Sequence, residues 1–383
     1  MKVKHLFMIV ALVLVARTAV AENKLSCRQS WMPPDTPVFC PWQAESSLSE
    51  ARSYHAVATF NDHLYVLGGF RFEASSSQVI YYDSVVQSTF QPDGRLAPWT
   101  AESSFKSARS GAAAITVGSC LFLAGGSSST PNSLTYFDDV QYAHINPDGH
   151  LSSWATSPSH LRIPRSNLSL VAVTSDQGTF LNAVAGVTQA GADTIHLDTI
   201  EVAKVGTDCS VGEWKIASYH LKGGRSTPQA LAIRNNTVVV GGWGDLDLID
   251  VYSDVQTSAW RPDGSPSPWK VSTGRLTTGI YGHATILAEA EPKPGPTLLL
   301  SVGGQPGTGA YANWISYAYV MPDFPLPDAI GLWRIAPSGQ LPTGRAGLGL
   351  ARWRNRLYVI GGNAANGSYL RDVISTQFDL GTP

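Results

Sequence analysis

Residues 64–69 read LYVLGG, an apolar run closed by two glycines, and near-copies of it return along the chain. The copies are LFLAGG ending at Gly126, LNAVAG at Gly186, TVVVGG at Gly242, LLLSVGG at Gly304 and LYVIGG at Gly362. The last glycines of successive copies are 56 to 62 residues apart. A nearly constant spacing in this range is typical of repeated supersecondary units that pack against one another.

Each repeat carries further landmarks around its glycine pair. An arginine and a small apolar stretch precede the pair, and an acidic residue with a β-branched run, a turn and a tryptophan follow it. The arginines are Arg52, Arg109, Arg165, Arg225, Arg275 and Arg345, and the tryptophans are Trp99, Trp154, Trp214, Trp269 and Trp333. The turn reads PDG at 92–94, 147–149 and 262–264, where proline presets φ and Asp-Gly accepts hairpin geometry. Each unit therefore predicts four short strands, called a to d outward from the axis.

Six glycine-rich, four-stranded units of about 58 residues predict an all-β fold, a six-bladed β-propeller. A helical solenoid would need apolar residues at a period of 3.6, and no stretch after the N-terminal segment has that pattern.

The two ends of the sequence predict how the ring closes. The sixth unit stops at Pro383 without its tryptophan strand, whereas Cys40-Pro41-Trp42 precedes the first arginine. We expect segment 22–50 to complete the last blade with its strand d, which removes an exposed sheet edge.

The N-terminus has the layout of a secretory signal peptide. Lys2 and Lys4 precede an uncharged run at 6–16, and AVA at 19–21 offers a cleavage site. The predicted signal is 1–21 and the predicted propeller is the single domain 22–383, secreted to an extracellular or periplasmic space. An uncleaved membrane anchor is the alternative. No later stretch approaches the roughly 20 apolar residues of a membrane span.

Charge argues against a nucleic-acid partner. Without Lys2, Lys4 and Arg17, 24 basic residues stand against 29 acidic ones, a net charge near −5. Binding phosphates needs clustered positive charge.

Four cysteines in an exported chain predict two disulfides, and sequence alone permits three pairings. The expected positions in the blades favour Cys27 with Cys40 and Cys120 with Cys209.

The arginine, the glycine pair and the tryptophan together resemble kelch repeats, over about 340 residues and all six units. The third unit departs from the pattern with Ala185-Gly186, and the fifth with Pro322-Asp323-Phe324 at the start of a longer connection. The resemblance implies a propeller.

Chain direction places the arginines and the loops after the glycine pairs on one face, the top face, and the PDG turns on the opposite one. The loops carry aromatic residues: Phe70, Trp243, Tyr311 and Trp314. Aromatic planes beside arginines suit an acidic sugar or an acidic peptide. For the arginines as a set we favour a structural role in every blade, with ligand binding by two or three as the alternative. For the two tryptophans, packing within the loops is favoured over exposed binding.

Metal sites are weakly signalled. His55 and His283 share strand a, but zinc usually takes three or four ligands, so a structural role is favoured. Asp245, Asp247 and Asp250 lack the glycine and terminal glutamate of a calcium loop. No matching set for the copper of galactose oxidase relatives can be placed. We expect no metal and no cofactor.

Three N-x-S/T sequons occur, at Asn167, Asn235 and Asn366, and they predict glycosylation if the source is eukaryotic.

The sequence thus predicts a secreted, non-enzymatic recognition module that binds a glycan or a protein through its top-face loops. One alternative is a carbohydrate-acting enzyme similar to the kelch-like sialic-acid epimerases, with a top-face arginine and a carboxylate such as Glu73. Another is a structural subunit of a surface assembly.

Overall fold

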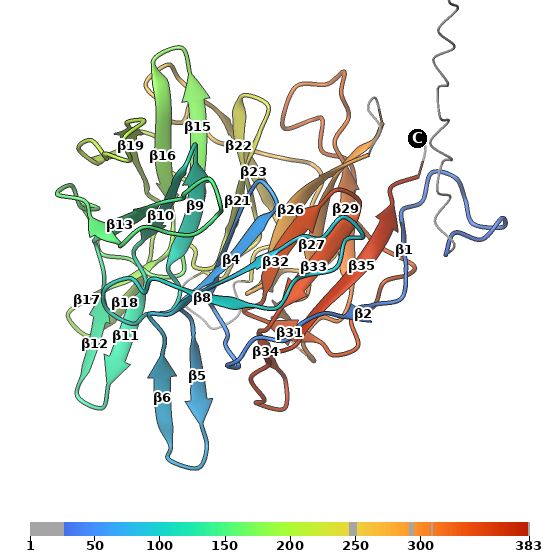
Figure 1. Cartoon of the computed structure of the whole chain (residues 1–383). Coiled ribbons are helices and arrows are strands. Elements are labelled where there is room, and N and C mark those ends of the chain that lie inside the picture. Colours follow the sequence, from blue (N-terminus) through green and yellow to red (C-terminus); the bar gives the residue numbers. More distant parts are fainter. Residues whose placement is uncertain (1–26, 245–250, 291–294, 308, 382–383) are drawn as a thin grey trace, which may run out of the picture.

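The computed structural model describes residues 27–244, 251–290, 295–307 and 309–381 (Figure 1). All regular structure in these ranges is β-strand. The strands form six antiparallel sheets in sequence order, and the innermost strands of adjacent sheets contact one another around a ring. The predicted six-bladed β-propeller is confirmed.

The first three blades follow the predicted a-to-d order. Blade 1 contains β3 (Ala56–Phe60), β4 (His63–Leu67), β7 (Val85–Thr89) and β8 (Thr100–Glu102). Blade 2 contains β9 (Ala113–Val117), β10 (Cys120–Ala124), β13 (Val140–His144) and β14 (Ala155–Thr156). Blade 3 contains β15 (Ser169–Ser175), β16 (Gly178–Val184), β19 (Ile200–Val205) and β20 (Lys215–Ile216).

These three blades also extend a hairpin from the top face, between strands b and c (Figure 1). The hairpins are β5–β6 (Phe70–Glu73 and Gln78–Tyr81), β11–β12 (Ser127–Thr130 and Ser133–Tyr136) and β17–β18 (Val187–Ala190 and Asp193–His196).

In the described residues of the last three blades, no two strands between b and c pair as a hairpin. Blade 4 contains β21 (Gln229–Ile233), β22 (Asn236–Val240), β23 (Val255–Ala259) and β24 (Lys270–Val271). Blade 5 contains β26 (Ala284–Glu289), β27 (Thr297–Val302), β29 (Ile315–Tyr319) and β30 (Arg334–Ile335), with β25 (Ile280–Tyr281) pairing β28 (Gln305–Pro306). Blade 6 contains β32 (Gly349–Trp353), β33 (Arg356–Ile360) and β35 (Val373–Asp379), with β31 (Arg345–Ala346) pairing β34 (Asn363–Ala364).

The N-terminal segment completes blade 6, as predicted. β1 (Val38–Phe39) and β2 (Gln43–Ala44) both pair antiparallel with β35. Trp42 lies between these two strands, and its indole Nε1 donates to Gly339 O of blade 5 at 3.0 Å. The ring therefore has no free edge at its seam.

A buried carboxylate fastens the closing segment. Glu45 accepts from Ser375 Oγ in blade 6 at 2.6 Å and from Leu96 N in blade 1 at 3.0 Å. Glu102 of blade 1 accepts from Leu151 N of blade 2 at 2.9 Å in the same manner. The seam is thus held by the same kind of contact that joins blades 1 and 2, a glutamate carboxylate that accepts a backbone N–H of the next blade.

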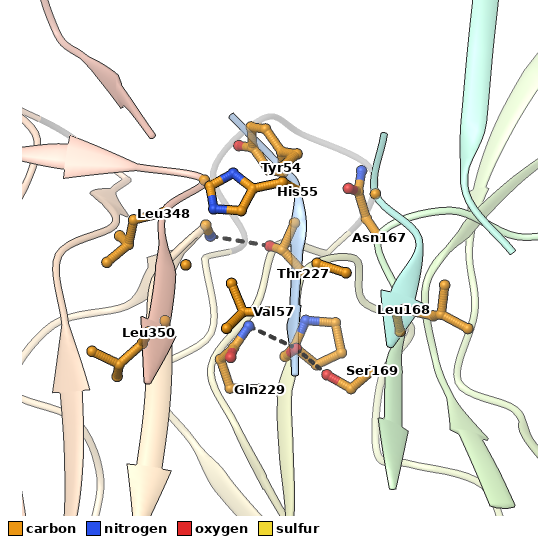
Figure 2. A pocket seen from close by; sticks show the side chains of 18 of the residues that line it. Tyr54, His55, Val57, Asn167, Leu168, Ser169, Thr227, Gln229, Leu348 and Leu350 are labelled. Atoms are coloured by element: carbon orange, nitrogen blue, oxygen red, sulfur yellow. Dashed lines mark hydrogen bonds between the residues drawn. The ribbon is translucent and has the colours of Figure 1, made fainter. Parts of the chain in front are cut away.

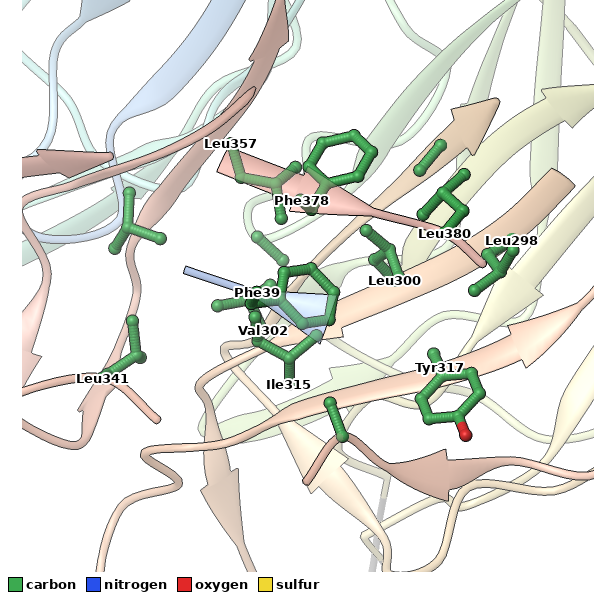
Figure 3. Packing of buried hydrophobic residues seen from close by; sticks show 14 of the residues in the cluster. Phe39, Leu298, Leu300, Val302, Ile315, Tyr317, Leu341, Leu357, Phe378 and Leu380 are labelled. Carbon is green, nitrogen blue, oxygen red and sulfur yellow. The ribbon is translucent and has the colours of Figure 1, made fainter. Parts of the chain in front are cut away.

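Strand b is apolar along its whole length because both of its faces are buried between blades. In β27, Leu298, Leu300 and Val302 pack with blade 6 residues such as Leu357, while Leu299 packs toward blade 4 (Figure 3). Alternate residues of a strand point to opposite faces, so burial on both sides requires a continuous apolar run. This explains runs such as LYVLGG and LLLSVGG.

The PDG turns lie at the opposite end of the blades from the hairpins. Their glycines have positive φ, 80° at Gly94, 83° at Gly149 and 75° at Gly264. In blade 3 Cys209 takes the glycine position with φ 65°. It is bonded to Cys120 of blade 2, with Cα atoms 5.6 Å apart. The Cys27–Cys40 bond is also present, with Cα atoms 5.4 Å apart, so both predicted pairings are confirmed.

The predicted arginine of the fifth unit is wrong in register. Arg275 is exposed, and Ile280 occupies the repeat position, since β25 pairs with β28 as Arg345 in β31 pairs with β34. Ile280 is buried, so in blade 5 an isoleucine side chain occupies the position that an arginine holds in the other blades.

Candidate binding site at the mouth of the central channel

The five remaining repeat arginines are buried and hydrogen-bonded within their own blades, although Nε of Arg52 has no partner in the described residues. Arg109, Arg225 and Arg345 each donate Nη1 to a carboxylate of their own blade and to the carbonyl of the first glycine of the pair. The nitrogen-to-carboxylate distances are 2.5 Å to Asp139, 2.6 Å to Asp254 and 2.8 Å to Asp372.

The other two arginines follow the same plan with small changes. Arg165 pairs with Glu201 at 2.5 Å and donates to Ala185 O at 2.9 Å. Arg52 donates to Gly68 O at 3.0 Å and to Ser84 Oγ at 3.3 Å. All five side chains are at most 1% exposed. A ligand on the top face could not reach them, so we do not retain these arginines as ligand-binding candidates.

Backbone hydrogen bonds link the blades above the arginines. The second glycine of each pair donates its N–H to the carbonyl at the arginine position of the next blade. The donor–acceptor pairs are Gly69–Arg109, Gly126–Arg165, Gly186–Arg225, Gly242–Ile280, Gly304–Arg345 and Gly362–Arg52. The series returns to its start, so the repeated glycine is part of a closed interblade network.

A second ring of contacts surrounds the channel mouth, two residues beyond the arginine position. Its members are Tyr54, Gly111, Asn167, Thr227, Gly282 and Gly347, and all six have φ between 50° and 63°. Five of them donate their N–H to the carbonyl of the preceding member over 2.7 to 2.9 Å. Gly282 N instead donates to Thr227 Oγ1 at 3.2 Å. Because all six residues share the left-handed conformation, their N–H and C=O groups point toward neighbouring members of the ring. The resulting hydrogen bonds fix the shape of the mouth.

Beneath this ring the channel holds a cavity of about 260 Å³, lined by strand a of every blade (Figure 2). This volume is below the range of roughly 300 to 1,000 Å³ that is usual for small-molecule sites. A ligand larger than a small fragment would therefore be held at the mouth and not inside the channel.

His55 and His283 line the cavity and are buried without hydrogen-bond partners. Burial lowers the pKa of each to about 3, and the nearby charge of Arg52 acts in the same direction on His55. His55 lies beside Gly349 of blade 6, whereas His283 lies beside Gly241 of blade 4. The two rings belong to different blade interfaces, which supports the structural role that the sequence favoured.

A third histidine, His144, has Nδ1 3.2 Å from Sγ of Cys209. Within the described ranges, His144, Cys120 and Cys209 form the one grouping of three or more potential metal ligands. Both cysteines are in the disulfide, so one ligand remains. Asp245, Asp247 and Asp250 lie outside the described residues.

Aromatic side chains gather at the mouth on the side of blades 5, 6 and 1. Phe70 packs with Tyr54 and Tyr81 in stacked geometry, with ring centroids 6.1 and 5.9 Å apart, and with Tyr369 edge-on at 5.5 Å. Tyr54 reaches across the opening, since a Cβ at Gly282 of blade 5 would lie 3.1 Å from its hydroxyl. Figure 2 shows Tyr54 at the top of the cavity.

The cluster continues into blades 4 and 5. Trp243 stacks on Tyr281 with centroids 5.7 Å apart and meets His196 edge-on at 5.1 Å. Tyr311 accepts a hydrogen bond from Asn363 Nδ2 at 3.3 Å. We call the set the mouth cluster: Tyr54, Phe70, Tyr81, Trp243, Tyr281, Tyr311 and Tyr369.

The phenols of the mouth cluster are electrostatically coupled. Burial raises the pKa of Tyr54 above its usual value, and Tyr281, Tyr311 and Tyr369 raise it further. Burial likewise raises the pKa values of Tyr281 and Tyr369, each with Tyr311 as a neighbour. The hydroxyls of Tyr54, Tyr281 and Tyr369 thus stay protonated at neutral pH and can donate hydrogen bonds.

Charged residues of the first hairpin are already paired. Arg71 contacts Glu73 at 3.2 Å and Glu50 at 3.8 Å. Glu73 also accepts from Ser75 Oγ at 3.0 Å. Glu73, the carboxylate suggested for an epimerase-like site, is therefore engaged on the hairpin and not paired with a repeat arginine.

The structure brings together three of the four predicted loop aromatics, Phe70, Trp243 and Tyr311. Trp314 lines a groove on blade 5 beside Tyr311 and is half-buried against the core between blades 4 and 5. Sequence reasoning missed Tyr54 and Tyr281, and also Tyr81 and Tyr369. The first two stand one or two residues beyond the arginine position, a signal that could be used only after Ile280 was recognised as that position in blade 5.

The sequons differ in setting. Asn167 belongs to the ring at the mouth, and its Oδ1 lies against Gly111. Asn235 is exposed in the turn between β21 and β22, and Asn366 is exposed in a top-face loop. Asn366 is the best placed of the three for a glycan beside the mouth.

Comparison with known proteins agrees with this architecture. A family model described as the kelch motif matches residues 51–88, most of the first repeat. A solved structure of YjhT is similar, with a TM-score of 0.62 and 16% identity, over 87% of this chain and 99% of that one. The protein is a six-bladed β-propeller that carries a kelch motif at residues 51–88.

No curated protein sequence matches this kelch propeller. At 16% identity the likeness to YjhT shows the fold alone. The kelch fold supports protein or ligand binding, and the two disulfides are compatible with an extracellular location. In the part of the chain that the structure describes, no helix has the length and hydropathy needed to cross a bilayer.

Proposed function

We propose that this kelch propeller is a secreted, non-enzymatic recognition module whose mouth cluster binds an uncharged glycan. The observation that supports the proposal most directly is the convergence of seven aromatic side chains from blades 1, 4, 5 and 6 on one opening.

The chemistry of the cluster suits a sugar. A pyranose has an apolar C–H face and a rim of hydroxyls, and aromatic planes with polar edges complement both. Tyrosine hydroxyls and the amide of Asn363 supply donors and acceptors around the rings. The ring of hydrogen bonds holds the opening rigid, which lowers the entropy lost on binding.

The absence of charge from the mouth cluster favours a neutral ligand. The sequence suggested an acidic sugar or acidic peptide because arginines were expected on the top face. Five of those six arginines are buried and bonded within their blades, so they supply no charge-assisted bond to a ligand, whereas Arg275 is exposed. The charge of Arg71 is paired with Glu50 and Glu73 through its two Nη atoms.

Secretion rests on the predicted signal peptide at 1–21, which lies outside the described residues, and on the two disulfides. Disulfides form and persist in oxidising compartments. Both features support an extracellular or periplasmic location.

The proposal is tested with the purified chain 22–383 on an array of neutral, sialylated and uronic-acid glycans, followed by calorimetry. We expect hits among neutral glycans. Tyr369→Ala or Tyr281→Ala should lower the affinity at least tenfold, or about 1.4 kcal/mol. Trp31→Ala is the control, since Trp31 is an exposed tryptophan near the N-terminus. Binding that survives both tyrosine changes would refute the proposed site.

NMR of the bound sugar over several hours tests the non-enzymatic part. The anomeric and ring signals should keep their populations. Catalysed change in those signals would establish an enzyme, as in the epimerase alternative. An empty array with stable co-purification of a protein would instead support a protein partner.

A further inference from the structure

A groove on the top of blade 5 offers a second place for a ligand. It has a volume of about 680 Å³, within the range of small-molecule sites, and nine residues line it. Trp314 and Tyr311 supply aromatic surface, and Thr277, Thr278 and Asn313 supply polar groups.

All nine lining residues are uncharged. Thr277 and Thr278 contribute hydroxyls to the lining, Asn313 a side-chain amide and Trp314 an indole N–H. The lining thus combines two aromatic surfaces with neutral donors and acceptors. That combination fits a sugar unit better than an ion or a purely apolar ligand.

Tyr311 connects the groove to the mouth cluster. Its side chain lines the groove, while its hydroxyl accepts from Asn363 and couples with the hydroxyls of Tyr54, Tyr281 and Tyr369. A ligand unit seated at the mouth therefore has a neighbouring site across one side chain, in the direction of Trp314.

We infer that the blade 5 groove is a second sugar subsite, so that the protein binds a neutral oligosaccharide with one unit at the mouth and its extension over Trp314. This inference rests on the proposed function. It specifies the ligand further, because a monosaccharide would fill the mouth and leave the groove empty.

The test is a chain-length series measured by calorimetry on the chain 22–383. The probes are oligomers of one to six units of glucose, mannose, galactose and N-acetylglucosamine. We expect the affinity for the preferred series to rise roughly tenfold from one unit to three, which corresponds to about 1.4 kcal/mol. Trp314→Ala should abolish this gain and leave the monosaccharide affinity unchanged.

Because Trp314 also packs against the core, its removal could disturb the fold. Asn313→Ala changes an exposed side chain, and we expect it to reduce the chain-length gain at least threefold with an unaltered melting temperature. Trp31→Ala should leave the whole series unchanged.

The outcomes separate the two ideas. An affinity that does not depend on chain length, or a gain that survives both groove variants, overturns the subsite and leaves the proposed function standing. If no neutral sugar of any length binds, both fall. Loss of the gain in both variants, with monosaccharide binding retained, supports the subsite.

Discussion

Single residues in this propeller take different roles at equivalent places in the repeat. His55 and His283 stand where blades 3 and 6 have Leu168 and Leu348, one residue after the ring at the mouth. Each histidine lies without a partner in a blade interface, so it is retained only in its neutral form. The repeat therefore tolerates an ionisable residue at a hydrophobic position, with a consequence for acid stability.

Replacing His283 should flatten the acid side of the stability profile. The folded pKa of about 3 lies below the ordinary 6.5, so the unfolded chain binds protons first. Above pH 6.5, protonation of His283 takes nothing from the free energy of unfolding. As the pH falls from 6.5 toward 3, that free energy decreases by up to about 1.4 kcal/mol per pH unit. Urea unfolding at pH 6.5, 5.5 and 4.5 should show a shallower decline for His283→Leu. Parallel curves for the variant and the wild type would contradict the assignment.

The buried arginines should contribute more to the free energy of unfolding than Arg275, which does not occupy the repeat position. Arg225→Ala leaves the carbonyl of Gly241 without its donor and the Asp254 carboxylate without its ion-pair partner, with only Gln256 Nε2 of the described residues still donating to it, and should cost about 3 to 5 kcal/mol in the free energy of unfolding. Arg275→Ala is the matched control and should change it by less than about 0.5 kcal/mol, because Arg275 is exposed. Equal effects in chemical denaturation would show that the register correction is mistaken.

At the scale of the element, the same type of turn joins strands c and d in four blades, and the residue at its third position varies. The Asp carboxylate of each turn accepts the N–H two residues on, with distances of 2.9 Å for Asp93, 3.1 Å for Asp148 and Asp208, and 3.0 Å for Asp263. Blade 3 keeps this hydrogen bond and places a cysteine where the others have glycine. A covalent bond to blade 2 thereby replaces packing contacts used elsewhere.

Removing this disulfide should destabilise the protein by about 4 kcal/mol, since the bond spans 89 residues. The form of the removal should matter. Cys120→Ala with Cys209→Gly should be more stable than Cys120→Ala with Cys209→Ala by about 1 kcal/mol, because the φ of 65° at position 209 suits glycine. Thermal unfolding of the two double variants gives the difference, and the opposite order would argue against a shared turn conformation.

At the scale of the whole molecule, closure of the ring depends on the segment farthest in sequence from its partner. β1 and β2 cover β35, Glu45 bridges blades 6 and 1, and Arg28 pairs with Asp379 at 2.5 Å. These contacts join the two ends of the described chain and convert six blades into one cooperative ring.

Deleting the closing segment should expose the edge of β35. A chain that begins at residue 46 should melt at a lower temperature and form oligomers, because an unpaired edge strand recruits other strands. A chain that begins at residue 27 keeps every described contact and serves as the control. Light scattering and calorimetry would decide, and a monomeric, equally stable short form would show that closure contributes little.

The repeat itself was readable from the sequence because its causes are local or strictly periodic. Glycine pairs, PDG turns and doubly buried apolar strands recur at fixed places, and the missing last strand pointed to segment 22–50. The arginines were assigned to the correct face but could not be classed as buried until their partners were seen. Arg275 was assigned to the repeat position of blade 5 because it lies only five residues before Ile280, the residue that occupies that position.

The sequence by itself determined the fold class, the number of blades and the seam, since each follows from the order and spacing of residues along the chain, and through the expected blade positions it favoured the two disulfide pairings that the structure contains. Only the tertiary structure decided the candidate site. Tyr54, Tyr281, Tyr311 and Tyr369 come from three blades and lie up to 315 positions apart in the printed sequence, and no local motif links them. A propeller brings such residues together because every blade contributes one short segment to the same central opening.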